Sequence, residues 1–392
     1  MNQETLKMSA KERQREAVMR RYKSGKILLK EAAWEMRVSV RQAIRIKQKF
    51  EAEGTEGLIH RARDIPSNRG YSEEFRSKVL EIYRDSYDDF GPTLASEKML
   101  EREGIEMNHE TLRRWLIKTK LWQVGTKGRV HRTKRERRER FGELIQIDGS
   151  DHAWFEERGE KAMLMVMIDD ATGKIMLHMA KEETTDAALI VLKKWTEKYG
   201  VPAAIYADKR TVYFTEEYVL NHDRRDDPAV FTRFMRVTDR LGIEMIPAHS
   251  APAKGRVERA NSMLQDRLVK ELRLRGINTI DEANAMLDAF AEEINRKFAK
   301  VPTRQADAHR SAPHGKTQWE YFFCYEETRK VQKDNTVVYK KEYWQILKQE
   351  GGPRPGAKVT LRSPLSGVTP YWLLGEKRLK VQYLGRAKPR RA

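Results

Sequence analysis

The stretch GELIQIDGSDHAWF, residues 142–155, decides the fold of the middle of this chain. Its apolar run at 144–147 predicts a buried strand, and we expect the strand to end on Asp148. The basic segment before it, GTKGRVHRTKRERRER at 125–140, carries eight Lys or Arg side chains and two Glu. An acid at the tip of a strand, placed after the most basic segment of the chain, indicates a chemical role for that acid.

The chain as a whole is strongly basic. Its 392 residues contain 77 Lys and Arg against 58 Asp and Glu, so the formal net charge is +19 and the pI is about 9.7. This charge predicts a polyanionic partner, most simply nucleic acid, because Lys and Arg side chains that bind phosphates release counterions. A hydrophobic content of 39% is enough for folded cores, and the length predicts about two to four domains.

Composition excludes several other classes of protein. Cys324 is the single cysteine, so it has no partner for an internal disulfide, and no Cys and His residues have the spacing of a zinc site. We expect Cys324 to be a buried, unreactive thiol. The longest apolar run, at 162–168, is too short to cross a membrane, and the N-terminus lacks the apolar core of a signal peptide. The sequence therefore predicts a cytoplasmic protein without membrane contact, which in a bacterium would have access to the chromosome.

Residues 9–60 have the pattern of a helix-turn-helix DNA-binding domain. A helix at about 28–36 is followed by a tight break and by a second helix that Ser39 caps. We expect Val40, Ile44 and the small Ala32–Ala33 pair to pack the two helices together, which leaves the polar face of the second helix free to enter a major groove. A small helical bundle with a solvated basic face is the alternative.

A second helical module, winged or helix-turn-helix-like, is predicted at 72–120, where Asn108 is expected to cap the third helix. The basic linker at 121–140 is expected to follow the phosphate backbone, although a charge run alone is also typical of a solvated segment. The DNA-binding side chains predicted in these parts are Arg41, Gln42, Arg45, Arg113, Arg114, Arg132, Lys134, Arg135, Arg137 and Arg138.

From residue 141 the pattern changes to strands. Strand-like and helix-like segments follow one another in the order βββαβαβα, which indicates a mixed sheet flanked by helices. We assign residues 141–300 to this catalytic core. The strand-rich residues 317–392 predict a small basic β-barrel at the C-terminus, so the chain is expected to be a multidomain α+β protein.

Three acids of the core are the candidate catalytic residues. Asp148 and Asp208 are expected to end two core strands at the same edge of the sheet. Glu258 lies in the first turn of a long helix, on the face that carries Asn261 and Gln265. Clustered carboxylates repel one another unless cations neutralise them, and hard oxygen ligands select Mg²⁺ or Mn²⁺. Two such ions can clamp the attacking and leaving oxygens of a phosphoryl displacement, and we expect Asp148 to bridge both.

Each acid taken alone has a plainer interpretation. An Asp at the end of a strand is usually a turn residue, and Glu258 could pair with an arginine on its own helix. The other acids near these strands are interpreted as such turn residues, and they are Asp151, Asp169, Asp170, Glu182 and Glu183. The set of three acids on two strands and one helix, in a strongly basic chain, favours the catalytic interpretation.

Three motifs resemble those of bacterial insertion-sequence transposases of the Asp-Asp-Glu type, close to the ISNCY group. They are GELIQIDGSDHAWF, IYADKRTVYF and AHSAPAKGRVERANSMLQDRLVKELRL, and the similarity covers most of residues 10–310. The resemblance implies an RNase H-like integrase core and a metal-binding triad of Asp148, Asp208 and Glu258. It also implies a homo-oligomer that binds the terminal inverted repeats of a mobile element, cleaves double-stranded DNA with Mg²⁺ or Mn²⁺, and transfers 3′-hydroxyl ends to target DNA.

The sequence departs from the pattern of that group at three places. The proline of the group's Ser-Pro-x-Ala-Lys-Gly segment is displaced by one position, to Pro252. Asp151 stands where the group usually has proline. The spacing between Asp208 and Glu258 is 49 residues, which is longer than in retroviral-type integrases. All three triad carboxylates are nevertheless present.

Two basic residues at the start of the long helix complete the predicted site. Lys254 and Arg256 are expected to hold DNA ends, because the N–H groups of a helix N-terminus attract phosphate. Two functions other than a transposase stay open. One is a nuclease that cuts DNA without joining it, and the other is a DNA-binding regulator, such as a domesticated transposase with an inert core.

Overall fold

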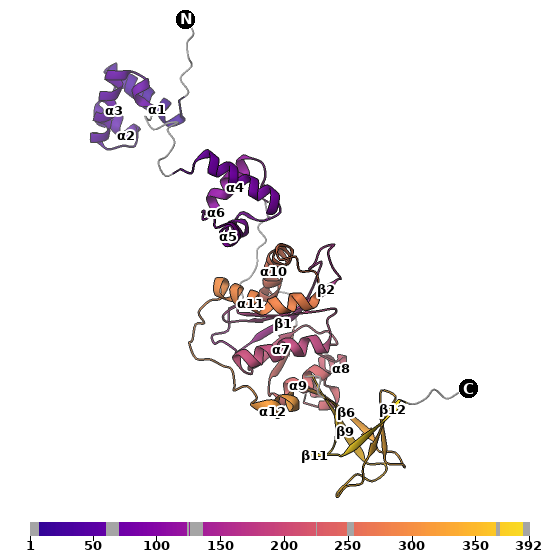
Figure 1. Ribbon diagram of the computed structural model, residues 1–392. Helices are drawn as coiled ribbons and strands as arrows, with labels where there is room; N and C mark the ends of the chain where they lie inside the picture. Colours follow the sequence, from indigo (N-terminus) through magenta and orange to yellow (C-terminus); the bar gives the residue numbers. More distant parts are fainter. Residues whose placement is uncertain are drawn as a thin grey trace. The chain divides into compact units, whose positions relative to one another are not determined.

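The computed structural model describes residues 8–59, 70–123, 125, 136–224, 226–248, 255–365 and 369–386. They fall into two compact units, Met1–Gln123 and Val124–Ala392. Figure 1 draws both units and labels their α-helices and some of their strands. The finer domain boundaries predicted from the sequence stay predictions.

The first unit contains two successive groups of three helices. The helices are α1 (Ala10–Lys23), α2 (Leu29–Glu35), α3 (Val40–Glu53), α4 (Glu73–Ser86), α5 (Pro92–Glu103) and α6 (His109–Lys118), with a 3-10 turn at Glu56–Leu58. Ser39 Oγ accepts a hydrogen bond from the backbone N–H of Gln42 at 3.2 Å. The Asn108 side chain accepts one from the backbone N–H of Glu110 at 2.8 Å. Both predicted caps are therefore confirmed.

The face of α3 that packs against its neighbours differs from the expected one. Val40 and Ile44 are 43% and 41% exposed, whereas Ala43 and Ile46 are buried. The prediction that Val40 and Ile44 pack the two helices together is therefore wrong. Ala43 shares a buried cluster with Ala32 and Ala33 of α2, so the predicted packing role of this alanine pair is confirmed. Small side chains let two helices approach closely. The exposed face of α3 consequently carries two apolar side chains.

A five-stranded mixed sheet forms the centre of the second unit. Its strands are β1 (Ile145–His152), β2 (Ala162–Asp169), β3 (Ile175–Ala180), β4 (Ala204–Ala207) and β5 (Glu244–Pro247). The spatial order is β3-β2-β1-β4-β5; β3, β2 and β1 pair antiparallel, and β1, β4 and β5 pair parallel. The predicted mixed sheet is confirmed, and β1 is its middle strand.

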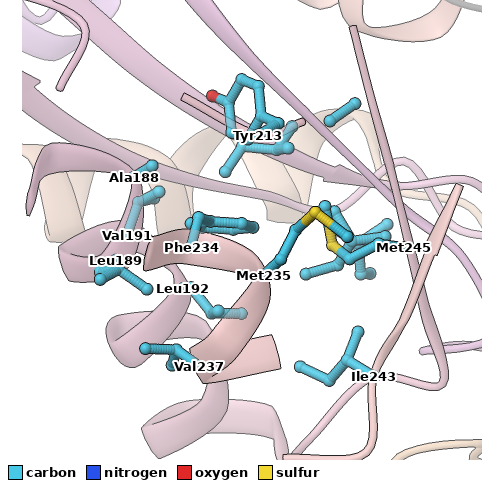
Figure 2. Packing of buried hydrophobic residues seen from close by; sticks show 14 of the residues in the cluster. Ala188, Leu189, Val191, Leu192, Tyr213, Phe234, Met235, Val237, Ile243 and Met245 are labelled. Atoms are coloured by element: carbon cyan, nitrogen blue, oxygen red, sulfur yellow. The ribbon is translucent and has the colours of Figure 1, made fainter. Parts of the chain in front are cut away.

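Helices cover both faces of this sheet (Figure 1). They are α7 (Thr185–Tyr199), α8 (Glu216–Leu220), α9 (Arg233–Arg240), α10 (Gly255–Leu274) and α11 (Ile280–Phe298), with 3-10 turns at His222–Arg224 and Pro228–Val230. One buried cluster joins α7 and α9 to Ile145 and Ile147 of β1. Another joins α10 and α11 to Leu164 and Val166 of β2. Figure 2 shows part of the first cluster, where Phe234 of α9 lies beside the side chains of α7.

Strand β1 separates apolar from polar side chains by simple alternation. Ile145 and Ile147 pack on the α7 side. Gln146, Asp148 and Ser150 therefore take the opposite face, because successive side chains of a strand point to opposite faces. Gln146 and Ser150 are buried although they are polar. Buried polar groups need hydrogen-bond partners, and helix α10 supplies them.

Strand β3 is an edge strand whose outer side is covered by helix α11. Asn295 accepts a hydrogen bond from the N–H of Ile175 at 2.7 Å and donates one to its carbonyl oxygen at 3.0 Å. Asn284 makes the same pair of bonds to Met179, at 2.9 and 2.8 Å. The two side-chain amides thus replace a neighbouring strand and satisfy backbone groups that an open edge would leave unpaired.

The C-terminal part of the second unit begins with α12 (Gly315–Phe322) and continues as strands. They are β6 (Cys324–Lys330), β7 (Thr336–Tyr339), β8 (Glu342–Ile346), β9 (Lys358–Pro364), β10 (Tyr371–Leu374), β11 (Lys377–Arg378) and β12 (Val381–Arg386). Among the described residues they form two antiparallel sheets, β11-β10-β9-β6 and β12-β8-β7. One buried cluster takes side chains from both sheets, including Val337 and Trp372. Closure of the sheets into a barrel stays a prediction.

The fold bears on two expectations drawn from composition, the buried thiol of Cys324 and the lack of an apolar run that could cross a membrane. Cys324 is buried, as predicted, and burial raises the pKa of its thiol, which favours the unreactive protonated form. No helix within the described ranges is long and apolar enough to cross a membrane.

Replacing Asn295 with Leu should destabilise the second unit, because the buried N–H and C=O of Ile175 then lose their partners. Each buried polar group left unsatisfied costs about 1–3 kcal/mol, so we expect the free energy of unfolding in urea to fall by about 2–4 kcal/mol. Arg296→Leu, at the exposed neighbouring position, is the matched control. Equal stability of the two variants would contradict this role of Asn295.

Candidate active site

Strand β1 continues past the point where the sequence predicts its end. Asp148 lies in the middle of the eight-residue strand, opposite Val166 of β2. The prediction that Asp148 ends the strand is therefore wrong. The physical reason is that β2 pairs with β1 as far as His152. This pairing keeps β1 extended beyond the end of its apolar run. Asp148 is thus a half-buried residue on the middle strand of the sheet.

Asp148 and Asp208 take equivalent positions on neighbouring parallel strands. The pairing of β1 with β4 ends at Gln146 and Tyr206. Asp148 is two residues beyond Gln146, and Asp208 is two residues beyond Tyr206. Neighbouring strands lie about 4.8 Å apart, so the two acids come together where the strands part. Asp208 directly follows β4, as predicted.

Helix α10 runs along the polar face of β1 and contacts it at three successive levels. The hydrogen bonds run from the Val257 N–H to Gln146 Oε1 (3.3 Å), from Asn261 Nδ2 to Asp148 Oδ2 (3.2 Å) and from Gln265 Nε2 to Ser150 Oγ (3.2 Å). We call this set of contacts the β1–α10 ladder. Four residues of a helix rise by about 6.0 Å and two residues of a strand by about 6.6 Å. The helix and the strand therefore stay in step along the whole ladder.

Glu258 lies in the first turn of α10, three residues before Asn261. Residues three apart share a helix face, so Glu258 projects from the same side as the asparagine that binds Asp148. Its side chain is exposed. Within the described part of the chain, no three Asp, Glu, His or Cys side chains are close enough together to hold a metal ion. The structure therefore brings Asp148 and Asp208 together, and Glu258 does not join them.

Glu183 is a candidate that sequence reasoning missed. Its side chain is 6% exposed, so it is not the solvated turn residue that the sequence indicates. It lies against Gly149, where an added Cβ atom would come within 2.8 Å of the Glu183 carboxyl carbon. Burial raises the pKa of this carboxyl group, and the guanidinium of Arg210 opposes the shift. No local pattern marks Glu183, because its burial depends on residues distant in the sequence.

Arg210 places a positive charge among these acids. Its guanidinium pairs with Glu183 and, at 3.0 Å, with Asp208. The negative charge of Glu183 raises the pKa of the guanidinium most strongly, and the charges of Asp208 and Asp148 act in the same direction. Arg210 is therefore the counter-charge of Glu183 and Asp208, and the negative charge of Asp148 also acts on it.

Tyr213 separates the acids from the apolar core. Its ring packs against Phe234 with ring centres 5.3 Å apart, at the margin of the cluster in Figure 2. Burial, followed by the negative charge of Glu183, raises the pKa of its phenol well above the usual value. The Tyr213 hydroxyl and the Glu183 carboxylate interact with each other, and Tyr213 opposes the rise in the pKa of the Glu183 carboxyl group.

Two of the predicted ligands are of the type that a hard divalent cation binds. Asp148 and Asp208 present carboxylate oxygens, which are the ligands that Mg²⁺ and Mn²⁺ prefer, but no third acid among the described residues lies close enough to complete a metal site. The ion pairs of Arg210 with Glu183 and Asp208 offset part of the negative charge of these acids within the fold. Glu258 must move nearer to Asp148 and Asp208 before the three acids can bind the same cations, so the triad stays a prediction.

The side chains predicted to bind DNA through the first unit lie at its surface. The exposed ones are Arg41, Gln42, Arg45 and Arg114. Arg113 is partly buried and pairs with Glu110 at 3.1 Å. Arg114 approaches the same acid at 3.6 Å. Their roles in DNA binding stay predictions.

The predicted linker lies only partly within the described residues. Outside them lie Arg132, Lys134, Arg135 and Lys254. Arg137 donates a hydrogen bond to the carbonyl oxygen of Ala171 at 2.8 Å. Arg138 comes within 3.6 Å of Glu143. The end of the basic segment therefore rests on the core.

Arg256 and Asp170 differ from their predicted roles. Asp170 and Asp169 are fully buried and are not surface turn residues. Asp169 accepts hydrogen bonds from the backbone N–H groups of Gly142 at 3.0 Å and Thr172 at 2.6 Å. Arg256 pairs with Asp170 at 2.6 Å, because a buried carboxylate needs a counter-charge. In this structure the Arg256 guanidinium consequently faces the interior and is not presented to DNA.

The chain is similar in sequence to two curated proteins over most of its length. It is 38% identical over 338 residues to the "Putative transposase y4bF" of Sinorhizobium fredii, which covers 86% of this chain and 73% of that protein. It is 30% identical over 317 residues to the "Transposase for insertion sequence IS1202" of Streptococcus pneumoniae, which covers 72% of this chain and 67% of that protein.

Other comparisons concern single parts of the chain or its shape. Residues 14–64 match a family model described as a helix-turn-helix domain. The HTLV-2 integrase catalytic core domain in complex with magnesium is 18% identical with a TM-score of 0.29, over 38% of this chain and 84% of that one. A simian T-cell lymphotropic virus intasome chain is 15% identical with a TM-score of 0.35, over 80% and 100% of the two chains. At such scores the structural likeness is weak.

Replacing Asn261 with Asp should place a like charge at the 3.2 Å contact with Asp148. Because adjacent carboxylates repel, we expect the free energy of unfolding to fall by about 1–3 kcal/mol in EDTA, with part of the loss recovered in millimolar Mg²⁺. Chemical denaturation in the two buffers measures both effects. Ser262→Asp adds the same charge at an exposed neighbour, and a loss of equal size there would contradict the ladder contact.

Proposed function

The chain belongs to the family of insertion-sequence transposases, and we propose that it cleaves and joins DNA strands at the ends of a mobile element. The observation that carries this proposal is the equivalent placement of Asp148 and Asp208 on neighbouring parallel strands, with Asn261 of α10 bound to Asp148. The proposal also places the chain close to the ISNCY group of these transposases and gives it an RNase H-like core.

Recognition of the element ends is assigned to the helix-turn-helix domain. Its helix α3 exposes Arg41, Gln42 and Arg45 together with Val40 and Ile44. Arginine and glutamine side chains can bind base edges in a major groove, and apolar side chains can contact thymine methyl groups. The two exposed apolar residues, which packing within the domain leaves unexplained, therefore fit a base-reading face.

Contacts to phosphate are assigned to the second helical group and the basic segment. Arg113 and Arg114 lie on α6, and the basic segment leads from the first unit to the core. Such contacts position a protein on DNA without reading its sequence. They also make binding fall steeply with salt concentration, because each neutralised phosphate releases counterions.

Two divalent cations, Mg²⁺ or Mn²⁺, are part of the proposal. Asp148, Asp208 and Glu258 are the residues that would hold them. When bound, such ions polarise the scissile phosphate and lower the pKa of the attacking hydroxyl group. The residues present fit this role through their oxygen donors, with Glu258 the acid that must come nearer.

The protein side chains orient the reaction and form no covalent intermediate. Asn261 fixes one oxygen of Asp148, and the backbone N–H of Arg210 donates to Asp208 Oδ1 at 3.2 Å. Water attacks the phosphorus at the element end, the P–O3′ bond breaks, and the released oxygen takes up a proton as a 3′-hydroxyl. That hydroxyl then loses its proton, attacks a phosphate of the target DNA and displaces the target's own 3′ oxygen.

Joining one element requires that both of its ends reach the same target. A single copy of the chain has one candidate triad, so we propose that at least two copies act together as a homo-oligomer on paired ends. Double-stranded DNA, as element end and as target, is then the partner of the assembly.

Replacing Asp148 with Asn should abolish cleavage and joining but leave DNA binding intact. Loss of a residue that only supports a metal ligand costs about 10–100-fold in activity, so loss of the ligand itself should cost more than about 100-fold. The measurement uses the full chain, Mg²⁺ and a labelled oligonucleotide that carries the terminal repeat flanking the gene. Asp151→Asn, on the same strand and exposed, is the matched control and should keep its activity.

The products decide between the proposed function and its alternatives. A joined product that depends on Asp148 supports a transposase. Cleaved ends without any joined product indicate a nuclease. Equal behaviour of the wild type and Asp148→Asn in every assay would indicate a DNA-binding regulator with an inert core and contradict the proposal.

A further inference from the structure

Asp170 lies at the centre of a buried polar network beside strand β1. It directly follows β2 and is fully buried. Its Oδ1 accepts hydrogen bonds from Gln146 Nε2 at 3.0 Å and from Arg256 Nε at 2.6 Å. Its Oδ2 accepts one from the backbone N–H of Arg138 at 2.8 Å. One carboxylate thus binds strand β1, helix α10 and the end of the basic segment.

The network holds the first turn of α10 from two sides. Arg256, the second residue of the helix, is buried and bonded to Asp170. The next residue, Val257, donates its N–H to Gln146 Oε1, so the Gln146 amide accepts from α10 and donates to Asp170. Its orientation is therefore fixed at both ends. Glu258 follows these two residues directly, so the place of its backbone depends on the network.

The same network holds the end of the basic segment on the core. The Arg138 N–H binds Asp170, and the Arg137 guanidinium binds the carbonyl oxygen of Ala171 at 2.8 Å. Arg256 Nη2 donates to the carbonyl oxygen of Glu136 at 3.0 Å. The Asp170 carboxylate and the Arg256 guanidinium therefore join residues 136–138 to the first turn of α10.

We propose that Asp170 is a positioning residue that couples the docking of the basic segment to the placement of Glu258. A docked segment completes the bonds of Asp170 and Arg256, and the first turn of α10 is then held against β1. When the segment undocks, Asp170 loses the Arg138 N–H and Arg256 loses the Glu136 carbonyl oxygen. The inference rests on the proposed function, because it gives the place of Glu258 a catalytic meaning.

Asp170→Asn tests the anchor, and Asp169→Asn is its matched control. An asparagine has one acceptor oxygen and an amide NH₂ that cannot accept, so a donor of the network loses its partner and Arg256 loses its counter-charge. Asp169 is equally buried and equally bonded, but to Gly142 and Thr172. The two variants therefore remove the same charge from adjacent positions, and only the first is expected to affect α10.

Hydrogen–deuterium exchange on the metal-free full chain is the first measurement. In Asp170→Asn we expect peptides spanning residues 255–265 to exchange at least about tenfold faster than in the wild type, with the central sheet unchanged. In Asp169→Asn the same peptides should exchange at the wild-type rate. Faster exchange throughout the core in both variants would show a merely structural role and overturn the inference.

Arg138 offers a second pair of variants that leaves the carboxylate in place. Proline at 138 removes the backbone N–H that binds Asp170, whereas alanine keeps it. We expect Arg138→Pro to speed exchange at the start of α10 and Arg138→Ala to leave it unchanged. This pair decides the question if Asp170→Asn does not fold. Equal exchange in the two Arg138 variants would overturn the coupling of the segment to the helix.

The Mg²⁺ dependence of strand joining separates this inference from the proposed function. Asp170→Asn should need at least about tenfold more Mg²⁺ for its half-maximal rate, while Asp169→Asn keeps the wild-type requirement. If the wild type joins DNA and Asp170→Asn needs no more Mg²⁺ than it does, the positioning role is wrong. If the wild type joins no DNA, the proposed function fails, and the catalytic meaning of the anchor fails with it.

Discussion

The hydrogen bonds of the β1–α10 ladder are the constraint on which the rest of the core depends. They satisfy the polar side chains of Gln146, Asp148 and Ser150 on one face of the central strand. Buried polar groups must be paired, so these polar side chains can stay on this face of β1 only if α10 packs against it in this register. The same register places Glu258 on the helix face that carries Asn261, and the opposite face of β1 is left to pack on α7.

Much of this architecture could be predicted because short-range signals decide it. Ser39 and Asn108 begin their helices by capping backbone N–H groups within three residues of themselves. The alternation of Ile145 and Ile147 with polar residues defines a strand with two unlike faces. Asp208 follows its strand, and Glu258 opens its helix, at the predicted places.

The features that were not predicted depend on partners far away in the sequence. Strand β2 extends β1 beyond its apolar run, which puts Asp148 inside the strand instead of at its end. In the sequence, Glu183 is an ordinary acid between β3 and α7. It is buried because the fold places it against Gly149 and Arg210. Asp170 becomes a buried anchor because Arg256, more than eighty residues later, pairs with it. No local pattern contains such pairings.

The central claim is that Asp148, Asp208 and Glu258 come together around divalent cations. The most direct measurement is anomalous diffraction from manganese in crystals of the full chain bound to element-end DNA. We predict two manganese peaks, with Asp148 bridging them and oxygens of Asp208 and Glu258 at about 2.1 Å from one peak each. Peaks held by Glu183 in place of Glu258, or no peak at these acids, would contradict the claim.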